Sequence, residues 1–216
     1  MKSYGVIGAG GLGRETMPLL RQMLPEVDAK SFFFVVEDKY EIQNSEVNGS
    51  KVLKLSDFLS LPGDKFYTIA IADSTTRERI SREIPGSAAS PVSVFANTFV
   101  SLDANEIGPG AVFASFTHVT SNAKIGKQFH CNIYSYIAHN VVIGDYVTFA
   151  PGVKCNGHVV IEDHAYIGAG AIIKDGTSSP ITIGKGAVVG MGAVVTKSVK
   201  PGDIVVGNPA KPLARR

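Results

Sequence analysis

The sequence of 216 residues predicts a two-part fold, an α/β domain followed by a parallel β-helix. Three observations carry this prediction. Strand-like and helix-like segments alternate over residues 1–85. From residue 107 onward, apolar residues recur every six positions, which is typical of a solenoid. Residues 86–104 are rich in Ser and Ala and form the expected connector, so the second domain is expected over residues 105–216.

The first part is expected to hold three strands and two helices. The strands are predicted at 3–7, 31–36 and 66–72, and the helices at 14–24 and 75–84. Pro18 falls in the first helix, and we expect it within about the first turn, where its missing N–H costs no hydrogen bond. Strands that alternate with helices form a parallel sheet with crossover helices.

A glycine-rich loop follows the first predicted strand. The segment GAGGLG at 8–13 matches the pattern G-x-G-x-x-G, which permits a tight turn and a close approach of the backbone to a ligand. The N-terminus of the following helix offers N–H groups to a phosphate. The candidate ligand-binding glycines are Gly8, Gly10, Gly11 and Gly13. The alternative is that they serve only the packing of the chain.

Charged side chains follow the other two predicted strands. Glu37 and Asp38 end the second strand, where a carboxylate can bind a ribose or a base. Asp73 and Arg77 follow the third strand at the same carboxyl edge, where ligands of α/β sheets collect. A full dinucleotide site needs two mononucleotide-binding halves, and this part has room for about one. A half-Rossmann domain of this size fits a nucleotide-linked sugar better than NAD.

The second part repeats with a period of six residues. All fifteen positions of the repeat are apolar, where the overall apolar content of 44% would fill about six or seven. The positions are Ile107, Phe113, Val119, Ile125, Cys131, Ile137, Ile143, Phe149, Cys155, Ile161, Ile167, Ile173, Ile183, Val189 and Val195. We expect these side chains to point inward, with three strands in each coil of 18 residues and coils about 4.8 Å apart.

The same period places the two cysteines and one insertion. Cys131 and Cys155 occupy inward positions on different faces, so we expect buried core residues and neither a disulfide nor a redox or metal role. The stretch 174–182 breaks the period by four residues and is expected to loop out. Such a loop can reach a neighbouring subunit or form a plain surface excursion, and both remain open.

One of the five histidines, His139, is the candidate general base. One coil further on lies Gly157, whose missing side chain leaves space for a slim ligand arm and exposes a backbone N–H. Asn140 has His158 in the same stacked relation. Histidine titrates near neutral pH, which suits a base, and the Gly157 N–H or the Asn140 amide can donate to an oxyanion. The alternative is an inert surface histidine.

Composition excludes several classes of function. The formal net charge of +2 with 19% charged residues lacks the clustered Lys and Arg that bind nucleic acid. The sequence holds no run of about 18 apolar residues, so no membrane span is expected. The N-terminus lacks the apolar run of a signal peptide, and we expect a cytoplasmic protein. The histidines do not fall on one face of neighbouring coils, so we expect no metal site.

Taken together, these segments resemble the hexapeptide-repeat nucleotide-sugar acetyltransferases. That family includes the N-acetyltransferases of the bacillosamine and perosamine pathways and the sialic-acid O-acetyltransferases. The segments that carry the resemblance span nearly the whole chain: GVIGAGGLGRE, FVVED, IAIADSTTR, residues 131–144, VKCNGHVVI and GNPAKP. The resemblance implies a left-handed β-helix, a homotrimer, and acetyl-CoA bound in the groove between adjacent subunits.

The resemblance also implies roles for individual residues. The glycine loop, with Glu37 and Asp38, holds a nucleotide, most often UDP. His139 acts as the base, and Asn132, one strand earlier, matches an Asn of the substrate site. The residues that meet acetyl-CoA are Gly157, Ala169, Met191 and, near its adenine end, Lys211.

Three positions depart from the family pattern. Asn140 stands where the family has an acidic residue, which removes a negative charge beside the base, although its carbonyl can still accept the ring N–H. Leu12 stands where a histidine is common in the glycine loop, and Thr148 stands where some members carry a second histidine.

We therefore expect acetyl-CoA-dependent N-acetylation of a nucleotide-linked amino sugar, UDP-4-amino-sugars above all, for surface glycan synthesis. A hydroxyl needs stronger help from a base than an amine does, so the loss of the acidic partner favours the amine. The alternatives are O-acetylation of a sialic acid or another sugar, and a catalytically silent scaffold that binds a nucleotide sugar.

Overall fold

The protein is described by a computed structural model over residues 1–213. Its chain divides into two compact units, residues 1–97 and 98–216, and the division falls within the stretch 86–104. Within the described residues, no helix combines the length and the apolar character that crossing a membrane requires.

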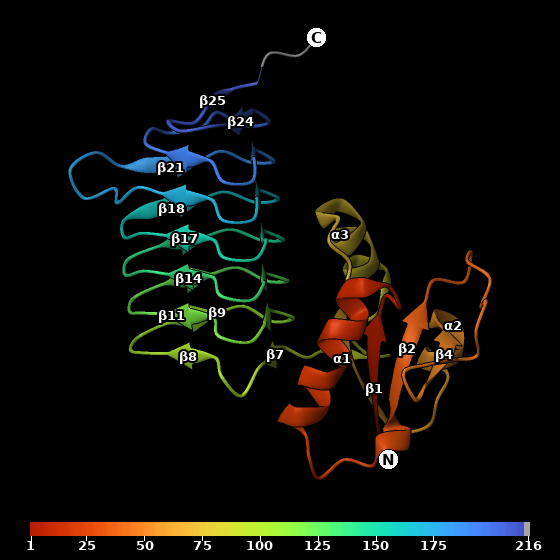
Figure 1. Ribbon diagram of the computed structural model, residues 1–216. Helices are drawn as coiled ribbons and strands as arrows, with labels where there is room; N and C mark the ends of the chain where they lie inside the picture. The colour runs from red at the N-terminus through yellow and green to blue at the C-terminus, as the bar shows by residue number, and fades with distance from the viewer. Residues whose placement is uncertain (214–216) are drawn as a thin grey trace. The chain divides into compact units, whose positions relative to one another are not determined.

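The first unit is a sheet of order β3-β4-β2-β1-β5-β6, in which all pairs are parallel except β3 with β4 (Figure 1). Its strands are β1 (Lys2–Ile7), β2 (Phe32–Val36), β3 (Glu46–Val47), β4 (Ser50–Lys54), β5 (Asp64–Ile69) and β6 (Ser90–Pro91). Its helices are α1 (Gly11–Met23), the 3-10 turn η1 (Ala29–Ser31), α2 (Leu55–Leu59) and α3 (Ser74–Glu83), and the short strand β7 (Val94–Phe95) closes the unit.

The three predicted strands and two predicted helices of this unit are all present. The sequence reasoning missed β4 and α2, because the segment SKVLK has exposed lysines and no clear period. Phe58 of α2 is fully buried and belongs to one core with Val35 and Ile80. Burial of this ring, together with the partly buried Leu55 and Leu59, holds α2 to the rest of the unit.

The expected place of Pro18 was wrong. The helix α1 begins at Gly11, directly after the glycine loop, and runs through Pro18 to Met23. Pro18 therefore lies beyond the first turn, where it removes one helical hydrogen bond. Its neighbours Met17 and Leu20 are 2% and 0% exposed, and their burial offsets that loss.

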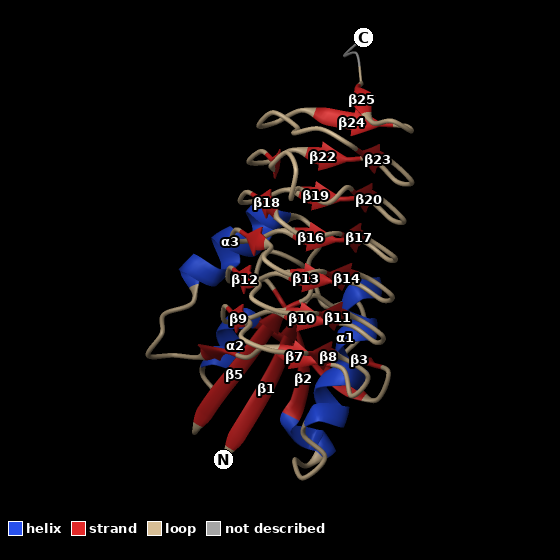
Figure 2. Cartoon of the chain, turned by 90° about the vertical axis from the view of Figure 1, so that its left-hand side faces the viewer, coloured by secondary structure: helices blue, strands red, loops and turns tan. Residues whose placement is uncertain are grey.

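The second unit is a parallel β-helix whose strands stack in three columns (Figure 2). The first sheet holds β10 (Val112–Phe113), β13 (His130–Cys131), β16 (Thr148–Phe149), β19 (Tyr166–Ile167), β22 (Val188–Val189), β24 (Ile204–Val206) and the antiparallel β25 (Lys211–Pro212). The second sheet holds β8 (Val100–Ser101), β11 (His118–Val119), β14 (Tyr136–Ile137), β17 (Lys154–Cys155), β20 (Ile172–Ile173) and β23 (Val194–Val195). The third sheet holds β9 (Glu106–Ile107), β12 (Lys124–Ile125), β15 (Val142–Ile143), β18 (Val159–Ile161) and β21 (Ile181–Ile183).

The predicted register of 18 residues is confirmed. Phe113 pairs with Cys131 in the first sheet, and Ile137 pairs with Cys155 in the second. Of the fifteen inward positions, all but Ile107 are buried. Phe149 packs edge-on against Phe129 inside the prism, with ring centroids 5.1 Å apart. The apolar repeat is therefore the core of the unit.

Both cysteines are buried free thiols in different sheets, as predicted. Burial raises the pKa of each thiol far above its ordinary value, and the charge of Cys155 adds to this effect at Cys131. Burial therefore disfavours the thiolate, which is the reactive and metal-binding form of a cysteine.

The predicted insertion is also confirmed. β20 ends at Ile173 and β21 begins at Ile181, and the intervening chain projects from the side of the β-helix (Figure 1). Pairing resumes with Val159 opposite Ile181, which brings Ile161 opposite Ile183. Because the extra residues come after Asp175, that residue still lies one coil beyond Gly157.

Replacing Phe149 with Ala is expected to lower the free energy of unfolding by about 3–5 kcal/mol, because it leaves a cavity between closely packed rings. Denaturant unfolding monitored by circular dichroism measures this change. Val142→Ala, at a position 44% exposed, is the matched control and should change it by less than about 0.5 kcal/mol. Equal losses in the two variants would contradict the assignment of the core.

Candidate functional site

The turns between the second and third sheets bring the candidate base together with side chains from the next two coils. Residues 139–140 follow β14, residues 157–158 follow β17, and residues 175–177 follow β20. The His158 N–H donates to the His139 carbonyl (3.2 Å), and the Gly176 N–H donates to the Gly157 carbonyl (2.8 Å). We call these residues the histidine corner.

His139 is exposed and is oriented by the residue that follows it. Its Nδ1 lies 3.1 Å from Oδ1 of Asn140. An amide oxygen only accepts, so Nδ1 carries the ring hydrogen and Nε2 carries the lone pair that can take a proton. Asn140 has a φ of 60°, a left-handed conformation that Asn tolerates better than most residues. The amide oxygen thus lies where it can accept the ring N–H.

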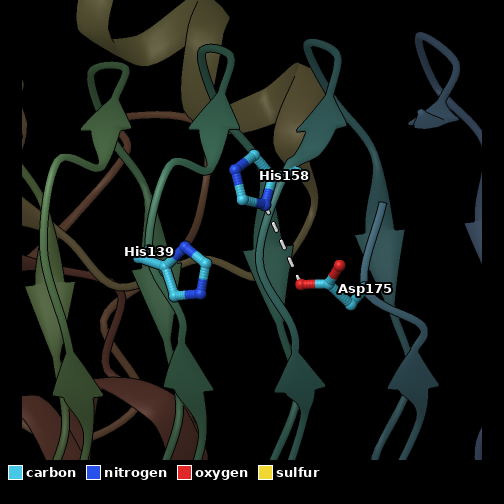
Figure 3. A group of neighbouring side chains, drawn as sticks. All are labelled: His139, His158 and Asp175. Carbon is cyan, nitrogen blue, oxygen red and sulfur yellow. Dashed lines mark ion pairs between the residues drawn. The ribbon is translucent and has the colours of Figure 1, made fainter. Parts of the chain in front are cut away.

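His158 and Asp175 complete the histidine corner (Figure 3). The rings of His139 and His158 lie at 80° with centroids 5.0 Å apart, and Nδ1 of His158 is 3.9 Å from Oδ2 of Asp175. The expectation that the histidines do not converge was therefore wrong for this pair. His139 and His158 stand at different places in their turns, and the bend of the corner turns the two side chains toward one another.

Gly157 is a glycine for a reason that the sequence did not reveal. A Cβ at this position would lie 2.7 Å from Cε1 of His139 and 2.8 Å from Oδ2 of Asp175. The expected space for a ligand arm at Gly157 is therefore not open, because the imidazole and a carboxylate from the following coil already occupy it. A side chain at 157 would push the imidazole and the carboxylate apart.

Three other residues expected to meet acetyl-CoA or substrate lie at the preceding corner, between the first and second sheets. Asn132 follows β13, Ala169 follows β19 and Met191 follows β22. The Gly192 N–H donates to the Ala169 carbonyl (2.8 Å), so these turns also stack, and Met191 is 82% exposed. We call this the methionine corner. In one chain, the strands of the second sheet separate it from the histidine corner.

Lys211 lies in β25 at the C-terminal end of the β-helix, opposite Val206. It lines a hollow that Lys197, Ser198 and Lys200 also line. Three lysines around one hollow favour an anionic group. The sequence reasoning singled out Lys211 alone, because the other two stand in a turn outside any motif.

The four glycines of the loop divide into two kinds. Gly8 has a φ of 110°, and a Cβ there would lie 2.7 Å from the Ala70 carbonyl oxygen, while a Cβ on Gly13 would collide with the Gly8 carbonyl. Gly10 and Gly11 have no atom within 4 Å of the corresponding point. Packing therefore accounts for Gly8 and Gly13, and Gly10 and Gly11 are the part of the loop that a ligand can approach.

The two acidic residues after β2, Glu37 and Asp38, are bound by side-chain and backbone groups of the first unit. Glu37 forms an ion pair with Arg79 (2.7 Å), and its side chain is 11% exposed. Oδ1 of Asp38 accepts hydrogen bonds from the N–H (3.2 Å) and hydroxyl (2.7 Å) of Ser56. Both carboxylates thus have protein partners at the edge of the sheet.

Asp73 and Arg77 have structural tasks at the start of α3. Oδ1 of Asp73 caps the helix by accepting from the Thr76 N–H (2.7 Å). Hydrogen bonds from Thr76, and then one from Thr75, hold the pKa of the Asp73 carboxyl below its usual value. Arg77 is fully buried, and its guanidinium donates to the carbonyls of Ile71 (2.8 Å) and Ala72 (3.1 Å). It supports the loop after β5 from within.

A hollow beside the glycine loop is lined by Ala9, Arg14, Val36 and residues 41–44. Glu41, Gln43 and Asn44 bring polar side chains to its wall. The segment carries no motif, which is why sequence reasoning passed over it. Its position next to Gly10 suits the part of a nucleotide that extends beyond the phosphates.

Comparisons with known proteins agree with this architecture. A family model described as the hexapeptide repeat of succinyl-transferase matches residues 158–197. GDP-perosamine N-acetyltransferase of Escherichia coli O157:H7 is 46% identical over 217 residues, which cover 100% of this chain and 98% of the relative.

Among solved structures, WeeI of Acinetobacter baumannii AYE is 52% identical with a TM-score of 0.94, over 99% of this chain and 100% of that one. The acetyltransferase domain of PglB from Neisseria gonorrhoeae FA1090, in complex with acetyl coenzyme A, is 25% identical with a TM-score of 0.85, over 98% of both chains. The α/β half followed by a left-handed β-helix is thereby confirmed.

Gly13→Ala is expected to lower the free energy of unfolding by about 1–3 kcal/mol, because the new methyl group meets the Gly8 carbonyl. Gly10→Ala, where the same methyl group meets open space, is the matched control and should cost less than about 1 kcal/mol. Thermal unfolding of both variants measures the difference. If Gly10→Ala were the more damaging change, the division of the glycines would be wrong.

Proposed function

The chain belongs to the hexapeptide-repeat N-acetyltransferases of nucleotide-linked amino sugars, and on that premise we propose that its histidine corner transfers the acetyl group. The substrates are acetyl-CoA and the amino group of a sugar on a nucleoside diphosphate. The observation that carries the proposal is the orientation of His139, whose Nδ1 is held by Asn140 so that Nε2 can act as the base.

The reaction is direct transfer. The amine nitrogen attacks the carbonyl carbon of the thioester, and the amine proton passes to Nε2 of His139. The C–S bond then breaks, and the sulfur of CoA leaves with the electron pair and takes the proton from Nε2 of the His139 imidazolium, which returns the ring to its neutral form. Backbone N–H groups or the Asn140 amide can stabilise the oxyanion formed in between.

The nucleotide is assigned to the first unit. Gly10 and Gly11 are open to the phosphates, and the hollow lined by Arg14 and residues 41–44 receives the remainder of the nucleotide. The resemblance in the sequence favours UDP. The relative that is 46% identical along the whole chain is named for a GDP-linked sugar, which makes GDP the second candidate.

Acetyl-CoA is assigned to a groove between two subunits of a homotrimer. The histidine corner and the methionine corner lie at opposite ends of the second sheet, so a second copy is needed to bring Met191 and Asn132 close to His139. The lysine-lined hollow around Lys211 suits the phosphates of the cofactor. Because acetyl-CoA is a cytoplasmic metabolite, we place the reaction in the cytoplasm, where precursors of surface glycans are made.

The direct test is turnover of acetyl-CoA with GDP-perosamine and, separately, with a UDP-linked 4-amino sugar. One of the two should be N-acetylated, and His139→Ala should lower kcat/KM by about 10²–10⁴-fold, the usual range for a general base. Release of the CoA thiol and mass spectrometry of the sugar follow the reaction.

His164→Ala, at the corner between the third and first sheets, is the control and should keep most of the activity. An undiminished rate in His139→Ala would remove His139 as the base. Binding of nucleotide sugar without any turnover would leave the chain a silent scaffold, and acetylation of a hydroxyl would show an O-acetyltransferase.

A site shared between subunits predicts complementation. His139→Ala and Asn132→Ala trimers should each be weakly active, and trimers reassembled from a mixture should regain activity, because some interfaces then pair an intact His139 with an intact Asn132. Steady-state rates before and after subunit exchange measure this. A mixture no more active than the mean of its parents would place both residues in one subunit's site.

A further inference from the structure

The histidine corner holds a carboxylate, Asp175, to which the sequence assigned no role. Asp175 stands at the start of the insertion, one coil beyond Gly157 and two beyond His139. Ring nitrogens of His139 and His158 and a carboxylate oxygen of Asp175 all lie within 4.8 Å of one another. Figure 3 shows the carboxylate on the same side as the two rings.

Asp175 faces the edge of His139 that takes the proton. The point where a Gly157 Cβ would stand lies 2.8 Å from Oδ2 of Asp175 and 3.0 Å from Nε2 of His139. The Nδ1 edge of the same ring is engaged by Asn140. A positive charge that forms on this imidazole is therefore flanked by a neutral amide on one edge and by a carboxylate near the other.

The charge on Asp175 is secured by its own loop. The Thr177 N–H donates to Oδ1 (2.7 Å). Hydrogen bonds from the Thr177 hydroxyl and then its N–H hold the pKa of the Asp175 carboxyl below its usual value, and the nearby His158 and His139 act in the same direction. Asp175 is therefore ionised at neutral pH.

His158 is tied to the same loop. Its Nδ1 lies 2.8 Å from the Thr177 hydroxyl. The Thr177 hydroxyl can donate to this nitrogen or accept from it, according to the tautomer of the ring. The titratable groups that face His139 at this corner are thus Asp175 and His158, and Thr177 links the two.

We propose that Asp175 is the charge partner of His139, a positioning residue that replaces from the inserted loop the carboxylate missing at Asn140. This inference rests on the proposed acetyl transfer. When Nε2 of His139 takes the amine proton, the imidazolium lies close to the Asp175 carboxylate, which favours the charged form. His158 and Thr177 keep the carboxylate turned toward the ring.

Asp175→Asn tests this, because an amide oxygen still accepts from Thr177 while the charge is lost. We expect kcat/KM on the plateau of the pH–rate profile to fall about fivefold, because exposed charges at this distance interact only weakly. The acid limb of the pH–rate profile should move to lower pH, since a neutral neighbour no longer favours the protonated imidazole. The KM for acetyl-CoA should stay within about twofold.

Asp145→Asn is the matched control, since Asp145 is also a turn carboxylate that accepts a backbone N–H (Lys127, 3.0 Å) but lies at another corner. It should leave the pH profile unchanged. Thr177→Val keeps every charge and removes only the hydroxyl, so it should shift the profile in the same direction as Asp175→Asn but by less.

The double variant His139→Ala, Asp175→Asn separates this proposal from the proposed function. If Asp175 acts through His139, the double variant is no slower than His139→Ala alone. The role of Asp175 would be overturned if the two substitutions lowered the rate independently, or if the pH–rate profile of Asp175→Asn matched that of the wild type. In either case, acetyl transfer by the wild type would still support the proposed function. If the proposed function is wrong, the wild-type protein itself does not transfer the acetyl group.

A chelator completes the test, since two imidazoles and a carboxylate can also hold a divalent cation. Activity that is unchanged after treatment with EDTA supports a charge partner. Activity that is lost with EDTA and restored by Zn²⁺ would overturn the proposal, because the three groups would then act as ligands.

Discussion

The register between coils is the constraint on which the rest of this structure depends. Strands pair with strands 18 residues later, as Ile137 does with Cys155, and the turns hydrogen-bond in the same step. An inner coil is bonded to both of its neighbours, so no side chain can move along the axis unless the ladder breaks. Residues that stand one coil apart are therefore held as neighbours by backbone bonds alone.

At the histidine corner, this register places residues from three successive coils next to one another. Gly157 lies between His139 and Asp175, and its hydrogen atom leaves the room that the imidazole edge and the carboxylate occupy. The four extra residues come after Asp175, so the carboxylate keeps its place before the chain leaves the prism. An insertion placed a few residues earlier would have carried Asp175 away from the ring.

In the first unit, the charged residues expected at the ligand site have partners within the protein. Arg79 neutralises Glu37, Ser56 binds Asp38, and the buried Arg77 holds two backbone carbonyls. A charge removed from water is stable only when it is paired or hydrogen-bonded, so these contacts build the rigid edge of the sheet. The open face of the loop at Gly10 and Gly11 is then left for a ligand.

The hexapeptide period by itself determined the β-helix, its core residues, the burial of both cysteines and the place of the insertion, because inward and outward positions follow from counting in sixes. The glycine loop indicated that a helix follows it, although α1 begins at Gly11, three residues before the predicted start, and runs past Pro18. Only the tertiary structure decided that His158 and Asp175 meet His139. A bend at a corner, and the path of a loop that leaves the period, depend on backbone torsions and long-range hydrogen bonds that spacing does not encode. The burial of Arg77 and the different roles of the four loop glycines also depend on segments distant in the sequence. They could therefore be read only from the structure.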